Sequence, residues 1–198
     1  KDVLIERVSL LSNYIISPHT IIRNVQKLAI EGETSFGNGV EVSVMDETGG
    51  RKIPIYNRLS AVLAYIAVFY RYKPEIINVI QHMVADYVAS INTRQGFVGE
   101  GTIIEGCGNL INIRVGENAE LMQVTHLKNC SINSASYAPV KIMNGVVAND
   151  FIVACGSTIA NNVRIERCFI GEACKITNGF TAHDSLIFAN SQLENGEA

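Results

Sequence analysis

A histidine near the C-terminus is the residue best suited to chemistry in this sequence. It stands in the segment Thr181-Ala182-His183-Asp184-Ser185, which Phe188-Ala189-Asn190 follows. A neutral imidazole, with a pKa of about 6.5, can accept the proton of a hydroxyl group that is a poor nucleophile at neutral pH. His183 is therefore a candidate for acid–base chemistry, and Asp184 stands beside it in the sequence. The alternative is that His183 is a surface residue at an ordinary corner of the fold.

Three further residues are candidates for substrate binding. His126 precedes the aliphatic Leu127 and could project into a cleft or simply lie at a solvated corner. In the segment Met45–Arg51, Asp46 could bind sugar hydroxyls, and Arg51 could hold a phosphate through two hydrogen bonds. Two glycines in this segment would let a backbone approach a ligand, although a simple turn would need them as well. No two histidines have the spacing of metal ligands, so we expect no metal.

A repeat of six residues must position these side chains. Aliphatic residues recur at Val147, Val153, Ile159 and Ile165, and then, after a step of five, at Ile170 and Ile176. Gly and Asn, which tolerate left-handed backbone conformations, recur at the bends between them. An amphipathic helix would instead repeat every 3.6 residues. The pattern predicts a mainly β protein, a parallel β-helix with coils in residues 1–56 and 94–198.

Residues 57–93 interrupt this pattern with apolar residues three and four positions apart. The first stripe runs from Leu59 to Tyr70, and the second follows Pro74, a residue favoured at the first position of a helix. We predict an inserted α-helical hairpin. Its apolar stripe must bury against the side of the β-helix or against a neighbouring subunit.

The composition excludes several classes of protein. A formal net charge of −3 without a Lys/Arg cluster argues against nucleic-acid binding, and the longest apolar stretch is broken by Arg71 and Lys73, so no membrane span is expected. Five cysteines without C-x-x-C spacing fit a reduced, cytoplasmic chain in which the thiols pack as small apolar residues. Because the chain begins at Lys1 and ends within a repeat, we expect both ends to be cut from a larger protein.

The six-residue pattern resembles the hexapeptide-repeat family of left-handed β-helix proteins, many of which are acyltransferases. Within that family, the His183 segment and the following Phe188-Ala189-Asn190 are similar to the "AHDC…LAN" stretch of UDP-N-acetylglucosamine O-acyltransferases. The resemblance implies that His183 is the general base, with the adjacent Asp184 as a second catalytic residue and Asn190 as a candidate substrate-binding residue. It also implies that acyl-CoA or an acyl-carrier protein is the donor. The chain also looks like a group of large uncharacterised bacterial hexapeptide-repeat proteins.

Two functional hypotheses follow. The first is an acyltransferase-like enzyme that acts on a nucleotide-linked or phosphorylated sugar, with His183 as general base. The second is a non-catalytic oligomerisation or regulatory module of a sugar nucleotidyltransferase or a larger assembly. In either case the flat faces and the helical stripe predict self-association, as a trimer if the resemblance holds.

Overall fold

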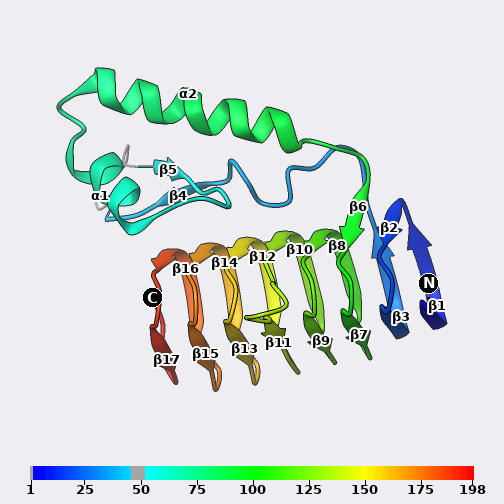
Figure 1. Cartoon of the computed structure of the whole chain (residues 1–198). Helices are drawn as coiled ribbons and strands as arrows, with labels where there is room; N and C mark the ends of the chain where they lie inside the picture. Colours follow the sequence, from blue (N-terminus) through cyan, green and yellow to red (C-terminus); the bar gives the residue numbers. More distant parts are fainter. Residues whose placement is uncertain (1, 46–51) are drawn as a thin grey trace.

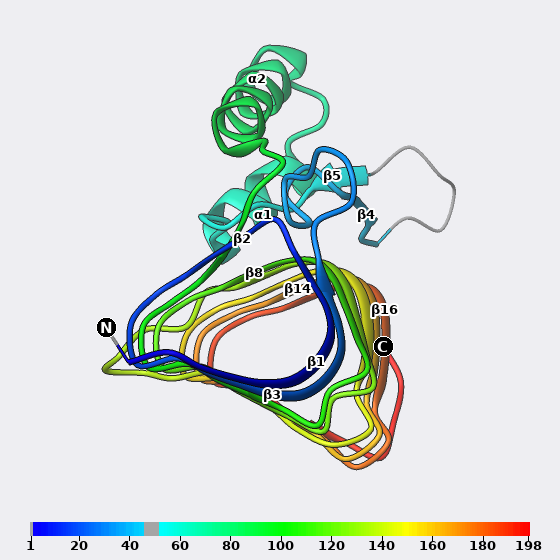
Figure 2. The ribbon, with the colours of Figure 1, turned by 90° about the vertical axis from the view of Figure 1, so that its right-hand side faces the viewer.

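A computed structural model describes residues 2–45 and 52–198, and its main body is a tube of coiled parallel strands (Figures 1 and 2). Each coil hydrogen-bonds to the next, and the view down the axis in Figure 2 has a roughly triangular outline. The prediction of a mainly β, β-helix-like architecture with a helical insertion is therefore confirmed. The strands of the tube are β1 (Leu4–Ser12), β2 (Tyr14–Ile16), β3 (Ile21–Ala29), β6 (Gly96–Val98), β7 (Ile103–Glu105), β8 (Asn109–Val115), β9 (Glu120–Met122), β10 (His126–Ile132), β11 (Lys141–Ile142), β12 (Val147–Val153), β13 (Thr158–Ala160), β14 (Arg164–Ile170), β15 (Lys175–Thr177), β16 (Thr181–Ile187) and β17 (Gln192–Glu194).

Successive coils repeat every 17 residues, as in the pairing of Arg167 on β14 with Asp184 on β16. The five-residue step in the sequence is thus a regular part of each coil. One coil is longer, because Asn129 on β10 and Asp150 on β12 are 21 residues apart. Strands β8, β10, β12, β14 and β16 form one continuous parallel ladder, and β7, β9, β11, β13, β15 and β17 form another.

The tube is filled by one or two inward side chains from each segment of a coil. Val153, Ile159 and Ile165 point inward as predicted and are at most 2% exposed. Val147 does not, because its half-buried side chain faces outward and Ala148 takes the inward position. The remaining core residues stack in register from coil to coil, among them Leu110, Leu127, Cys130, Phe151, Cys168, Ile170 and Ile176.

Asn and Gly occupy the corners for two different physical reasons. Asn161 and Asn178, one coil apart, have φ values of 63° and 57°, in the left-handed region that their side chains tolerate. Gly99 is required by space, because a Cβ on it would lie 2.4 Å from the backbone carbon of Gly116 in the next coil. The left-handed corner predicted for these residue types is therefore confirmed at Asn161 and Asn178, whereas Gly99 is needed for space alone.

The insertion leaves the tube after β3 and returns at β6 (Figure 1). It contains an antiparallel pair, β4 (Glu41–Ser43) with β5 (Lys52–Pro54), followed by α1 (Ala61–Phe69) and α2 (Pro74–Ile91). The excursion thus begins well upstream of the residue 57 boundary predicted from the helical pattern. Residues 30–42, which fall within the coils predicted for residues 1–56, therefore do not form a coil.

Local sequence explains where the helices begin. The hydroxyl of Ser60 accepts a hydrogen bond from the backbone N–H of Leu63 at 3.2 Å and caps α1, while Pro74 starts α2. The insertion packs on one side of the tube through a second apolar cluster, in which Val42 and Ile55 meet Ile152 and Phe169.

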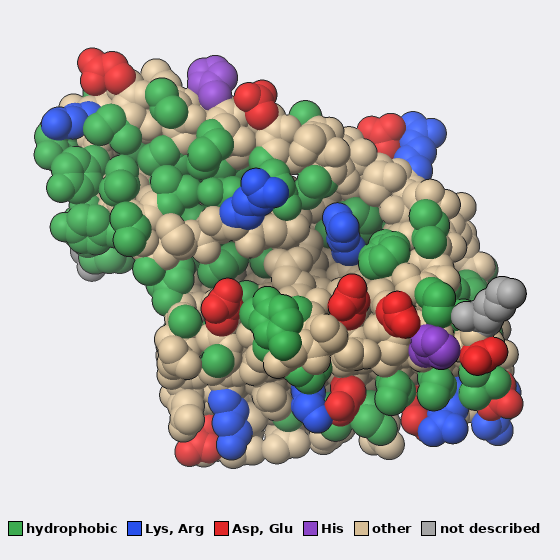
Figure 3. Space-filling model, in the orientation of Figure 1, with side chains coloured by type: hydrophobic (Ala, Val, Ile, Leu, Met, Phe, Trp, Pro, Cys, Tyr) green, Lys and Arg blue, Asp and Glu red, His purple; other side chains and the backbone are tan. Residues whose placement is uncertain are grey.

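Much of the helical stripe remains exposed. Apolar side chains gather over α1 and the start of α2 in the space-filling view (Figure 3). This helical patch comprises Val62, Tyr65, Phe69, Tyr72, Ile76, Val79 and Met83, which are between 37% and 72% exposed. The insertion therefore buries one part of its apolar surface on the tube and leaves another part in solvent.

Candidate functional site

Four polar side chains line up on one outer face of the tube, one from each of four neighbouring coils. Lys128 pairs in register with Asn149, Asn149 with Glu166, and Glu166 with His183. Their neighbours in the chain, Leu127, Ala148, Ile165 and Ala182, point inward, so alternation along the strand turns these four outward. We call the set Lys128, Asn149, Glu166 and His183 the outer row.

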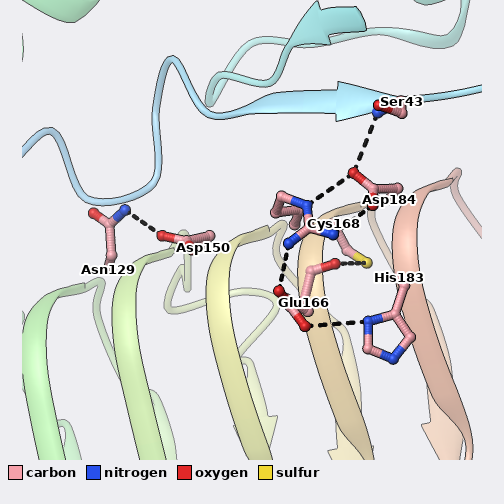
Figure 4. Close-up of polar contacts among 8 residues, drawn as sticks. Ser43, Asn129, Asp150, Glu166, Cys168, His183 and Asp184 are labelled. Carbon is pink, nitrogen blue, oxygen red and sulfur yellow. Dashed lines mark hydrogen bonds and ion pairs between the residues drawn. The ribbon is translucent and has the colours of Figure 1, made fainter. Parts of the chain in front are cut away.

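Within the outer row, the carboxylate of Glu166 contacts the imidazole of His183. The distance from Glu166 Oε2 to His183 Nδ1 is 3.3 Å, and the two side chains are 43% and 52% exposed (Figure 4). Because the Glu166 carboxylate lies against Nδ1, the ring nitrogen that remains open to a substrate proton is Nε2. This is the arrangement in which a histidine can act as a general base while a carboxylate orients it and stabilises its protonated form.

Next to the outer row, the coils turn through a column of residues with left-handed backbone conformations. We call Asn112, Asn129, Asp150, Arg167 and Asp184 the corner column, and their φ values lie between 47° and 54°. Most are Asn or Asp, the non-glycine residues that adopt this conformation most readily. The column fixes the position at which each coil bends, and with it the direction of the outer row.

Asp184 belongs to this corner and does not contact the imidazole of His183. Its carboxylate accepts hydrogen bonds from Arg167 Nε at 2.9 Å and Arg167 Nη2 at 2.6 Å, and from the backbone N–H of Ser43 at 3.3 Å. Figure 4 shows it directed toward Ser43 on β4, away from the histidine ring. The hydrogen bonds of Arg167 lower the pKa of Asp184, and Asp184 in turn raises that of Arg167.

Arg167 connects the corner to the outer row. Besides its two bonds to Asp184, it forms an ion pair with Glu166 through Nη1. The carboxylate of Glu166 is therefore shared between a guanidinium and the imidazole of His183. Glu166 and Arg167 were not predicted from the sequence. The signal that finds them is the coil length, because they stand 17 residues before His183 and Asp184.

A polar groove lies where the start of the insertion overhangs the corner column. It has a volume of about 660 Å³, and Glu33, Thr34, Ser35 and Asn92 of the insertion face the coils across it. The coil side is lined by Asn112, His126, Lys128, Asn129, Asn149, Asp150 and Glu166. Three members of the outer row thus form the floor, and Glu166 connects the groove to His183.

The other predicted site residues fall in different places. His126 lines the groove, which agrees with the interpretation that it projects into a cleft rather than lying at a solvated corner. Asn190 lies at another corner, where its backbone N–H donates to Glu172 at 2.9 Å, so the fold does not bring its side chain to the outer row. Asp46 and Arg51 lie outside the residues that the structure describes.

The structure also bears on metals and membranes. Among residues 2–45 and 52–198, no three His, Cys, Asp or Glu side chains cluster in a way that could hold a metal ion. In the same part of the chain, neither helix has the length and apolar character needed to cross a bilayer.

Comparison with known proteins identifies a family and a distant relative. An uncharacterized protein of Treponema pallidum (strain Nichols) is 23% identical over 173 residues, which cover 80% of this chain and 24% of the relative. The chain therefore spans about a quarter of the length of that curated protein. No solved structure matches. The sequence profile of a domain of unknown function, DUF4954, matches residues 1–198, so the chain belongs to the DUF4954 family.

Proposed function

We propose that this chain is a left-handed, hexapeptide-repeat β-helix enzyme that transfers an acyl group to a sugar, with His183 as general base. The observation that carries the proposal is the contact of Glu166 with Nδ1 of His183 at the end of a polar groove. Following the resemblance of the His183 segment, the donor is acyl-CoA or an acyl-carrier protein, and the acceptor is a nucleotide-linked or phosphorylated sugar. The five free cysteines fit a reducing, cytoplasmic location.

In the proposed reaction, Nε2 of His183 takes the proton of an acceptor hydroxyl as its oxygen attacks the thioester carbonyl. The new carbon–oxygen bond forms, the carbon–sulfur bond breaks, and the proton passes to the leaving thiolate. Glu166 holds the ring and stabilises the imidazolium between these steps. Glu166, and not the adjacent Asp184, takes the orienting role in this proposal, because the carboxylate of Asp184 is bound by Arg167.

The exposure of the helical patch favours an assembled enzyme. The imidazole of His183 is 52% exposed, so one chain alone leaves much of it in water, and a second subunit would exclude that water. We propose a trimer, in which the helical patch supplies apolar surface for the contact.

The test is release of free thiol from a panel of acyl-CoAs by the purified chain, with and without nucleotide sugars. We expect activity in the wild type, its loss in His183→Ala and a fall of about 100-fold in Glu166→Gln. His82→Ala is the matched control, because His82 is exposed on α2. His183→Ala should change stability by less than about 0.5 kcal/mol, as surface substitutions do. Unchanged turnover in His183→Ala would remove the catalytic assignment.

The same exposure supports a second candidate, a non-catalytic oligomerisation or regulatory module. A module of this kind needs the helical patch and the continuous coil faces but no reactive imidazole. It predicts self-association without thiol release from any donor. It also predicts that substitutions in the helical patch change the mass in solution, whereas His183→Ala does not.

A further inference from the structure

The groove beside the outer row differs from an ordinary small-molecule pocket, because every residue that lines it within ranges 2–45 and 52–198 is polar. Its volume of about 660 Å³ is within the usual range for ligand sites, so its size does not distinguish it. We propose that it binds the uncharged, hydroxyl-rich ring of a carbohydrate and leaves any phosphate of the ligand outside. The proposal builds on the proposed function in taking the acceptor to be a sugar, but binding needs no catalysis.

The charges in the groove argue against an anionic ligand. Glu33, Asp150 and Glu166 contribute carboxylates, and Lys128 is the single Lys or Arg among the described residues that line the groove. The carboxylates already have partners of their own, since Glu33 pairs with Arg94 at 3.0 Å and Asp150 accepts a bond from Asn129 at 2.6 Å. A phosphate would meet three carboxylates and one ammonium among the lining residues, while the guanidiniums of Arg94 and Arg167 are already paired with Glu33 and Glu166, so a neutral ligand is favoured.

The hydrogen-bonding groups suit sugar hydroxyls, which both donate and accept. The amide oxygen of Asn149 is buried without a hydrogen-bond partner among the residues that the structure describes. A buried polar atom in this state gains from a donor that a ligand supplies. Lys128 on one side of Asn149 is a donor, and Glu166 on the other side is an acceptor. These three side chains offer complementary partners to neighbouring hydroxyls on one ring.

The spacing of the coils sets the dimensions of the floor. Adjacent parallel strands are about 4.8 Å apart, so the two steps from Lys128 to Glu166 cover roughly 10 Å, and His183 follows one step further. A sugar on this floor would extend from Lys128 toward the imidazole. Any phosphate would project beyond the groove and contribute less to binding than the ring does.

The test is ligand-observed NMR and calorimetry on the full chain with three probes. These are N,N′-diacetylchitobiose, which is neutral, N-acetylglucosamine 1-phosphate, and UDP-N-acetylglucosamine. We expect the neutral disaccharide to bind, saturation transfer to fall mainly on sugar protons in all three probes, and added phosphate to raise the affinity by less than about tenfold. Asn149→Leu should lower the affinity for the disaccharide by about tenfold or more, which corresponds to the loss of one hydrogen bond.

Two controls make the result specific to the groove. Gln192→Leu makes the same kind of change at an exposed amide on β17, and it should leave binding unchanged. Asn149→Leu removes an unsatisfied polar atom, so its melting temperature should be no lower than that of the wild type. If Asn149→Leu nevertheless misfolds, Lys128→Ser is the second variant, because it changes an exposed side chain on the floor of the groove. It should also lower the affinity for the disaccharide.

Failure to bind the neutral disaccharide would overturn the proposal, as would a requirement for phosphate or equal affinity in folded Asn149→Leu. His183→Gln separates this proposal from the catalytic one, because it should keep disaccharide binding while losing transfer. If the wild type binds sugar but transfers no acyl group, the catalytic proposal is wrong and the proposal that the groove binds carbohydrate is supported. If it transfers acyl groups with an unchanged KM in Asn149→Leu, the groove proposal fails and catalysis stands.

Discussion

Asp184→Asn tests whether this carboxylate has a structural role at the corner of the coil. Asn tolerates the φ of 47° found at this position, so the substitution removes charge without straining the backbone. Charge-assisted hydrogen bonds contribute about 1.5–3 kcal/mol when they are well shielded, and exposed ion pairs about 0.2–1 kcal/mol. The side chains of Arg167 and Asp184 are 37% and 27% exposed, and we therefore expect a loss of about 1 kcal/mol at pH 7.

The pH dependence gives this prediction its sharpest form. Arg167 lowers the pKa of Asp184 in the folded chain, so the carboxylate stabilises the fold above its unfolded pKa of about 3.9. The stabilisation is lost as the pH falls through the lower pKa of the folded state. The wild type and Asp184→Asn should therefore differ in unfolding free energy at pH 7 and converge as the pH falls below about 3.9.

Urea unfolding at a series of pH values measures this difference, and the melting temperature at pH 7 should fall by about 2–4 °C for a chain of this length. Asp86→Asn is the control, because Asp86 is exposed on α2 and should give a much smaller change. If Asp184→Asn lowered the unfolding free energy equally at pH 7 and at pH 3, the reasoning would be wrong. Such an equal loss would mean that the effect comes from the amide at the corner rather than from the charge of Asp184.

Three further predictions concern the core, the thiols and assembly. Phe151 is fully buried, with the smaller Cys130 and Cys168 in register on either side. Phe151→Ala should therefore lower the free energy of unfolding, measured in urea, by about 3–5 kcal/mol. A loss below about 1 kcal/mol would mean that the tube is not closely packed. Burial raises the pKa of Cys107 and of Cys168 to about 11. A thiol reagent at pH 8 should therefore label the half-buried Cys155 first. Equal labelling rates for these three cysteines would contradict the burial of Cys107 and Cys168. Sedimentation equilibrium should give a trimer, and a mass near 21.6 kDa at micromolar concentration would refute it.

The coiled architecture could be predicted because each coil repeats the same physical requirement. One or two inward positions per segment leave an aliphatic signal, and left-handed corners leave an Asn or Gly signal, so both recur along the sequence. The start of the insertion could not be found in this way. Its β4 strand buries Val42 against Ile152 and Phe169, and an apolar residue buried on the outside of the tube resembles one buried inside.

The site was only partly predictable for a similar reason. His183 is recognisable from its segment, but its partner Glu166 lies one coil away and is identified only when the coil length of 17 residues is known. Adjacency in sequence suggested Asp184 instead. Neighbouring residues at a left-handed corner point in different directions, and this is why Asp184 reaches Arg167 and Ser43 while His183 reaches Glu166.

The place at which the insertion interrupts the coils has a consequence for the order of folding. Coils after β6 join partners 17 or 21 residues apart, whereas Arg23 on β3 and Glu105 on β7 are 82 residues apart. The longer loop adds about 1.4 kcal/mol of closure entropy to that pairing. The coils from β8 to β17 can therefore assemble by local steps, and β1 to β3 dock afterwards on an existing end. Amide protons of β1 and β3 should accordingly exchange through partial openings, while those of β12 and β14 should exchange only through complete unfolding.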